Sequence, residues 1–338
     1  MSDANTPLHV VAIGGGTGLS TLLHGLKRYA GPLATSRMDI TAVVTVTDDG
    51  GSSGRLRRDF DVLPPGDIRN CMVALSHDEA LLSRLFQYRF QSGRGLKGHS
   101  FGNLFLTAMT DITGDFAEAV KQSSEVMASA GRIYPATRTN VALEAVLADG
   151  AVVHGETNIN KSRKRIVAIR LLPRRCKPLP ETLDAIAQAD LITLGPGSLF
   201  TSVVPNLLVS GIAAAIRKSP AVKACYVNLM WEPGETTGFR ASEHLEVINR
   251  HARGRLIDYA VLNTGAIKPA LRKRYARENA EQVENDVERI GQMGMNIVAA
   301  DLVAGSVKVR HNPEAVAEIA LRLAGEGRRR REESGHAE

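Results

Sequence analysis

Residues 10–20 of the chain read VVAIGGGTGLS, an apolar run that stops at a glycine cluster and continues as a helical pattern. Residues 10–13 are short, uninterrupted and rich in β-branched side chains, which predicts a buried parallel strand. From Leu19 onward the leucines recur at helical spacing, so the glycines join the end of a strand to the start of a helix. The stretch therefore predicts an α/β fold built on strand, glycine loop and helix.

The first glycine loop has the composition of an anion-binding turn. Gly14, Gly15, Gly16 and Gly18, with Thr17 among them, accept unusual backbone angles and let a ligand approach the main chain. A helix N-terminus adds free N–H groups and a positive dipole, which suit a phosphate. A tight turn without a ligand is the alternative. Because the lysine of a P-loop and the Gly-x-Gly-x-x-Gly spacing of a dinucleotide site are absent, the loop indicates a generic nucleotide site.

A second loop follows the strand predicted at residues 40–46. Asp48 and Asp49 stand at its start, before a run of glycines and serines. Carboxylates beside a phosphate can hold Mg²⁺, so these two residues are metal-ligand candidates. The alternative is that they cap the loop by accepting from backbone N–H groups. Ligands of open α/β sheets bind beyond the carboxyl ends of the strands, so both loops are predicted to face one crevice.

A third polar loop spans residues 64–70. Asp67 is predicted to cap a helix that begins near Ile68. Arg69 and Asn70 lie in the first turn of that helix, and we expect both to point toward the ligand in the crevice.

A fourth polar loop spans residues 98–103 and leads into an apolar helix. His99 and Asn103 can bond a ligand phosphate or hydroxyl. The alternative is structural, with Ser100 capping the helix and His99 buried and hydrogen-bonded inside the protein.

The periodicity changes to two near residue 141. Alternating apolar residues over about 141–172, interrupted by an Asp149-Gly150 turn, predict a small antiparallel ribbon set into the α/β body. The strand-loop-helix pattern then returns with Gly195, Pro196, Gly197 and Ser198 after the strand predicted at 190–194. Two such loops indicate a ligand with two ends, such as a diphosphate that carries a base and another group.

Two more strand ends carry polar candidates. Asn228 closes the strand predicted at 221–229. Arg310 ends the strand predicted at 306–310, where Asn312 and Pro313 are typical of a helix start. Arg310 is therefore a candidate anion contact, and a surface salt bridge is its alternative.

Composition limits the function classes. The chain has 338 residues with a net charge of +6, which suits acidic small ligands such as nucleotides. Residues 321–338 hold four consecutive arginines offset by glutamates, and we expect a disordered charged tail rather than a nucleic-acid arm. No apolar run reaches membrane-span length, no secretory signal is evident and the three cysteines are far apart, so we expect a cytoplasmic protein with reduced thiols.

The motifs occur together in an order that closely resembles one family. Over about residues 8–320 the chain is similar to the bacterial gluconeogenesis factors (the YvcK type), within the superfamily of 2-phospho-lactate transferase (the CofD type). The segments that carry the resemblance are GGGTGL at 14–19, TDDGGSSGR at 47–55, PPGDIRN at 64–70, GHSFGN at 98–103 and GPGS at 195–198.

The resemblance implies a three-layer α/β/α, Rossmann-like fold with a mostly parallel sheet. It implies a cytoplasmic factor that binds UDP-sugars such as UDP-N-acetylglucosamine and links gluconeogenic carbon metabolism to cell-wall synthesis and cell shape. A protein partner in cell-wall synthesis and a homodimer are expected, and no reaction is implied for this branch. The transferase branch implies a second hypothesis, Mg²⁺-dependent phosphoryl or nucleotidyl transfer, with Asp48 and Asp49 as the candidate catalytic residues.

Overall fold

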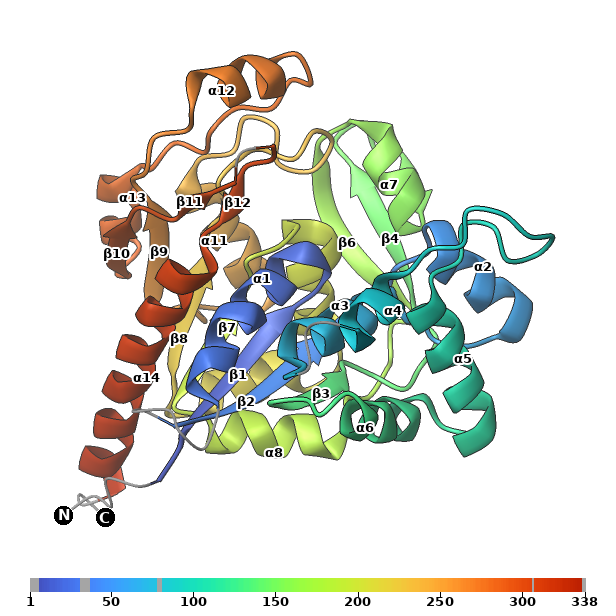
Figure 1. The fold of residues 1–338 in the computed structure, drawn as a ribbon. Coiled ribbons are helices and arrows are strands. Elements are labelled where there is room, and N and C mark those ends of the chain that lie inside the picture. Colours follow the sequence, from blue (N-terminus) through green and yellow to red (C-terminus); the bar gives the residue numbers. More distant parts are fainter. Residues whose placement is uncertain (1–5, 31–36, 78–80, 306, 336–338) are drawn as a thin grey trace.

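A seven-stranded parallel sheet forms the centre of the molecule (Figure 1). The computed structural model describes residues 6–30, 37–77, 81–305 and 307–335. The strands of the sheet are β1 (Leu8–Gly14), β2 (Met38–Val44), β3 (Arg132–Pro135), β7 (Leu191–Leu194), β8 (Val222–Tyr226), β9 (Tyr259–Asn263) and β10 (Asn296–Ala300). They lie in the order β10-β9-β8-β7-β1-β2-β3. The predicted strands at 10–13, 40–46 and 190–194 all fall in this sheet.

The strand order reverses between β1 and β7. From β1 the chain proceeds to β2 and β3 on one side, and later to β7, β8, β9 and β10 on the other. Val10 of β1 pairs with Leu191 of β7, so the two strands are direct neighbours although they are far apart in sequence. A reversal of this kind opens a crevice at the carboxyl ends of the two strands, where open α/β sheets bind ligands.

Helices cover both faces of the sheet. They are α1 (Gly16–Leu26), α2 (Gly51–Phe60), α3 (Gly66–Leu75), α4 (Leu82–Gln87), α5 (Phe101–Thr113), α6 (Phe116–Val126), α7 (Glu156–Ser162), α8 (Pro180–Gln188), α9 (Val204–Leu208), α10 (Ile212–Lys218), α11 (Ala241–His251), α12 (Pro269–Ala276), α13 (Val287–Gln292) and α14 (Pro313–Gly335), with a 3₁₀ turn at Lys27–Tyr29 and a π-helical turn at Leu199–Val203. Helices α1, α3 and α14 pack together on one face. Helices α8, α9, α10 and α11 form a second packed group, in which α10 contacts α8 and α9, and α9 contacts α11. Right-handed crossovers place such helices on the opposite face when a sheet grows in the other direction.

The predicted fold class is confirmed: the structure is a Rossmann-like α/β fold with a small antiparallel insertion. The insertion holds β4 (Ala142–Leu147), β5 (Val152–His154) and β6 (Ile166–Leu172) in the order β5-β4-β6. Buried and half-buried residues alternate along β4, as a strand with one face on the core requires. Helix α7 connects β5 to β6 and lies beside the carboxyl end of the main sheet (Figure 1).

The prediction of a disordered tail at 321–338 is wrong for residues 321–335, because helix α14 continues to Gly335, and residues 336–338 lie outside the described residues. Asp190 is completely buried at the start of β7, and Arg328 of α14 donates to both of its carboxylate oxygens at 3.0 and 2.7 Å. The backbone N–H of His9 donates to the same carboxylate at 2.8 Å. The arginine run is therefore partly an anchor of the last helix, which charge composition alone did not reveal.

One other prediction near the C-terminus differs from the structure, and one is confirmed. Only short two-residue strands, β11 (Val303–Ala304) and β12 (Arg310–His311), form where a strand was expected at 306–310, and residue 306 lies outside the described residues. Asn312 does cap α14, since its Oδ1 accepts from the backbone N–H of Glu314 at 3.0 Å. Arg310 is thus held between a tight β-pair and a helix start.

Within the described ranges no single helix is long and apolar enough to cross a membrane. One bent pair, Leu199–Leu208 with Ile212–Lys218, meets the length and composition limits together but turns by 80° between its halves.

Candidate functional site

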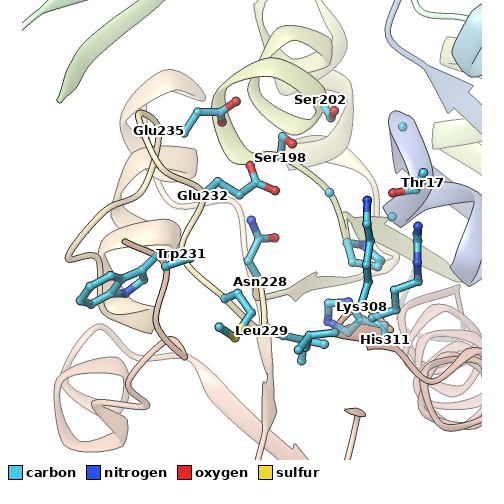
Figure 2. A pocket seen from close by; sticks show the side chains of 18 of the residues that line it. Thr17, Ser198, Ser202, Asn228, Leu229, Trp231, Glu232, Glu235, Lys308 and His311 are labelled. Atoms are coloured by element: carbon cyan, nitrogen blue, oxygen red, sulfur yellow. The ribbon is translucent and has the colours of Figure 1, made fainter. Parts of the chain in front are cut away.

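A pocket of about 460 Å³ opens at the strand-order reversal (Figure 2). Both glycine loops line it, together with the segment after β8 and the β12 segment. Of the residues proposed from sequence, the pocket brings together Gly15, Gly16, Thr17, Gly18, Pro196, Gly197, Ser198, Asn228 and Arg310. Gly14 and Gly195 are the flanking backbone of the two loops and are not among the lining residues.

The two glycine loops touch each other directly. A Cβ on Gly18 would lie 2.3 Å from the carbonyl oxygen of Pro196, so only glycine permits this approach. A Cβ on Gly15 would lie 2.6 Å from Cγ2 of Thr45 and 2.8 Å from Oδ2 of Asp67. Gly15 is the N-cap of α1 and supplies no side-chain cap. Asp67 accepts from the first-turn N–H of Gly16, so the N–H groups of Thr17 and Gly18 are the ones that remain available to an anion in the pocket.

Basic and acidic side chains lie on different sides of the pocket. Figure 2 shows Thr17 and Lys308 on one side, and Ser198, Glu232 and Glu235 on the other. Lys308 is exposed, as is its neighbour Arg310, which also lines the pocket and forms no ion pair among the described residues. The expected anion contact at Arg310 thus has the placement it needs, beside the glycine loops.

The acidic side was not assigned from the sequence. Glu235 is buried and accepts from the backbone N–H of Phe200 at 3.1 Å and from Oγ1 of Thr201 at 3.0 Å. Burial, followed by the charge of Glu232, raises the pKa of Glu235 to about 8. Glu232 also has a raised pKa because of burial, and it accepts a hydrogen bond from the Ser198 side chain. A proton held by this pair reduces the repulsion of an anionic ligand nearby.

His311 is a second residue that the sequence did not single out. It is 8% exposed, and its ring donates to the backbone carbonyl of Val227. Burial lowers the pKa of His311 to about 4, so the ring is neutral at physiological pH. Its position directly after Arg310 on the last strand end was the signal available in the sequence.

The carboxylates of the second and third loops lie behind the first glycine loop. Asp48 Oδ1 accepts from the backbone N–H of Gly50 at 2.8 Å. Asp49 Oδ1 accepts from the backbone N–H and the Oγ1 of Thr157, at 2.8 and 2.6 Å, and so attaches α7 to the main sheet. The Asp48 contact is the loop capping of the alternative, whereas Asp49 bonds the first turn of α7. Among the described residues no group of three His, Cys, Asp or Glu side chains is arranged to hold a metal ion.

Asp67 does not cap α3 as expected, because Pro65 is the N-cap and the helix begins at Gly66. Asp67 instead accepts from the backbone N–H of Gly16 in the first glycine loop. Burial and then the charge of Asp48 raise the pKa of Asp67 to about 6. Burial, followed by the charges of Asp48 and Asp67, raises the pKa of Glu156 at the start of α7 to about 9. The loops after β1 and β2 are thus joined through a half-buried cluster of carboxyl groups.

The residues of the fourth loop form a supporting network outside the main pocket. Arg69 donates to Oγ of Ser100 at 2.6 Å and to Oδ1 of Asn103 at 3.0 Å. His99 is buried and bonds Oγ of Ser52 at 2.9 Å, while Ser100 caps α5. His99 and Ser100 therefore have the structural roles given as the alternative to ligand binding. Asn103 and Arg69 belong to the same hydrogen-bond network.

Asn70 lies in a neighbouring cavity of about 390 Å³. Thr17, Thr21 and Arg310 line both this cavity and the main pocket, so the two are adjacent. The five predicted segments consequently meet at one end of the sheet but form two layers. The glycine loops, Asn228 and Arg310 face the pocket. The second, third and fourth loops pack behind the glycine loops.

Comparison with known proteins agrees with this architecture. The sequence profile of the family 2-phospho-L-lactate transferase CofD matches residues 10–303. The gluconeogenesis factor of Bacillus subtilis is 45% identical over 318 residues, covering 94% of this chain and 98% of that protein. The gluconeogenesis factor of Halalkalibacterium halodurans is 46% identical over 314 residues, covering 93% and 95%.

A solved structure shows the same fold. The crystal structure of a Bacillus halodurans protein aligns with a TM-score of 0.89 at 45% identity, covering 94% of this chain and 100% of that chain. A second crystal structure, described as a member of the UPF0052 family, aligns with a TM-score of 0.88 at 46% identity, covering 92% and 98%. The chain belongs to the CofD family and, within it, to the gluconeogenesis factors.

Proposed function

We propose that the pocket binds a nucleoside diphosphate sugar of the UDP-N-acetylglucosamine type. The observation that carries the proposal is the contact between the two glycine loops, Gly18 against Pro196, with Lys308 and Arg310 beside it. Free main-chain N–H groups and two cations suit a diphosphate. The volume of about 460 Å³ is in the range of small-molecule sites.

On this proposal the protein is a binding factor that reports the level of a cell-wall precursor and so links gluconeogenic carbon metabolism to cell-wall synthesis and cell shape. We infer a cytoplasmic location, in keeping with the buried free thiols Cys71, Cys176 and Cys225. The signal would pass to a protein partner, and a homodimer is part of the proposal.

Titration calorimetry with UDP-N-acetylglucosamine tests the binding. We expect Arg310→Ala to weaken affinity about 10- to 100-fold, since a charge-assisted contact is lost. Arg329→Ala is the matched control, because Arg329 is an exposed cation of α14 outside the pocket. A flat titration of the unmodified protein at about 1 mM ligand rejects the proposal.

A second candidate, Mg²⁺-dependent transfer of a phosphorus-containing group, is favoured by the match to the CofD family. Asp48 suits the metal better than Asp49, whose Oδ1 is engaged by two groups of Thr157. Mg²⁺ needs only one or two protein carboxylates when phosphates complete its shell. Bound there, the ion would neutralise charge on the diphosphate. If Asp48→Asn leaves Mg²⁺ affinity and any measurable turnover intact, this candidate is rejected.

A further inference from the structure

Two buried side-chain nitrogen atoms in the pocket wall lack a hydrogen-bond partner in the described part of the chain. Nδ2 of Asn228 and Nε2 of His311 form no hydrogen bond with any described residue, and both residues line the main pocket. Buried polar groups of folded proteins are nearly always hydrogen-bonded, so each exception needs an explanation. At a binding pocket, a partner atom on the ligand is a direct explanation.

The chemistry of these two atoms is complementary. His311 donates its other ring N–H to the carbonyl of Val227, so Nε2 carries a lone pair and can only accept. Asn228 directly follows Val227, and its Nδ2 can only donate. The wall therefore offers one uncharged acceptor and one uncharged donor. Asn228 itself is half-buried, so its amide lies partly at the pocket surface.

The surroundings decide what kind of group can use this wall. Glu232 and Glu235 occupy one side of the pocket and offer no cation to an anionic group. Lys308 and Arg310 stand by the glycine loops and favour the diphosphate there. The wall that Asn228 and His311 form suits an uncharged part of the ligand. The hydrogen bonds of that part replace those that water would make.

We propose that Asn228 and His311 are specificity-determining residues that bind an uncharged N–H and C=O edge of the ligand. The inference rests on the proposed function, in which the glycine loops hold the diphosphate. An imide edge of a nucleobase and the acetamido group of an amino sugar share this chemistry. The residues contribute recognition of that group and little to diphosphate affinity.

Calorimetry with inorganic diphosphate, UDP and UDP-N-acetylglucosamine separates the two sources. For Asn228→Ala and His311→Phe we expect about a 10-fold or larger loss of affinity for the ligand that carries the group. Inorganic diphosphate should keep its affinity within about twofold, because it has no such edge. A loss already present with UDP assigns the wall to the base, and a loss confined to UDP-N-acetylglucosamine assigns it to the sugar.

His244 provides a matched control. Its Nδ1 bonds the carbonyl of Arg240 at 2.9 Å, and its buried Nε2 has no partner among the residues that the structure describes, but it lies in α11 outside the pocket. His244→Phe should therefore leave all three affinities unchanged. His311→Gln, which restores an acceptor, should recover part of the loss that His311→Phe causes.

Three results are decisive against the inference. Unchanged affinities in both variants, or an equal loss for inorganic diphosphate, would overturn it while the proposed function stands. If the unmodified protein binds none of the three ligands, the proposed function itself fails and the inference fails with it. Thermal unfolding of each variant separates a folding defect from a binding defect, and Asn228→Asp, nearly isosteric, gives a second variant that should fold.

Discussion

Gly18 of α1 lies against Pro196 of the second glycine loop, where an added Cβ would be 2.3 Å from the proline carbonyl oxygen. This single approach joins the loop after β1 to the loop after β7. The two halves of the pocket are therefore one packed unit rather than two independent turns.

Gly18→Ala should destabilise the fold and weaken ligand binding together. The new methyl group meets backbone, which cannot move aside, so we expect a loss of about 1–3 kcal/mol in the free energy of unfolding. Gly51→Ala is the comparison, because Gly51 has φ +45 but a Cβ there would meet nothing within 4 Å. Urea unfolding measures both. A smaller loss for Gly18→Ala than for Gly51→Ala would contradict the packing argument.

Arg328→Met should unfold α14 from the sheet more easily. Asp190 is completely buried, and removing its bidentate partner leaves a carboxylate held mainly by Arg331 and the N–H of His9. We expect a loss of about 3 kcal/mol in the free energy of unfolding. Arg329→Met, at an exposed position of the same helix, should cost less than about 0.5 kcal/mol. Equal effects of the two substitutions would show that Arg328 is not an anchor.

Glu156→Gln should make stability less dependent on pH. The pKa of Glu156 is raised from 4.5 to about 9 in the folded protein, so the folded state binds more protons than the unfolded state between these values. Its contribution to the free energy of unfolding is therefore complete below pH 4.5 and is lost as pH rises toward about 9. Each tenfold change in proton affinity corresponds to about 1.4 kcal/mol.

The measurement is urea unfolding at about pH 5 and about pH 9. The variant should match the unmodified protein at the lower pH and exceed it by 1 kcal/mol or more, to order of magnitude, at the higher pH. Glu125→Gln, at an exposed position of α6, is the control. A gain of the same size at both pH values would rule out the protonation argument.

Asp49→Ala should loosen the inserted sheet. Both bonds from Thr157 to Oδ1 are lost, which should cost about 2 kcal/mol and increase proteolysis around α7. Asp48→Asn keeps an oxygen for the N–H of Gly50, so it should change stability by less than about 0.5 kcal/mol. Limited proteolysis and urea unfolding test the contrast, and the prediction is wrong if Asp48→Asn is the more destabilising of the two.

Much of the fold was predictable because local signals agree with the global topology. The strands predicted at 10–13 and 190–194 form as β1 and β7, since apolar runs and the glycines that follow them point to the same ends. The tail was not predictable, because Arg328 becomes structural only through Asp190, which lies 138 positions away. Charge composition describes a segment in water and contains no information about a distant buried partner.

The sequence by itself determined the strand-glycine-helix units and the family, because glycine clusters, apolar runs and capping residues act over a few positions. Only the tertiary structure decided which polar residues face the pocket. Asp49, His99 and Asn103 make contacts inside the protein, whereas Glu232, Glu235 and His311 line the cavity. The physical reason is that the reversal of strand order between β1 and β7 brings together segments that are far apart in the sequence, such as Val10 and Leu191, and burial there sets their hydrogen bonds and charges.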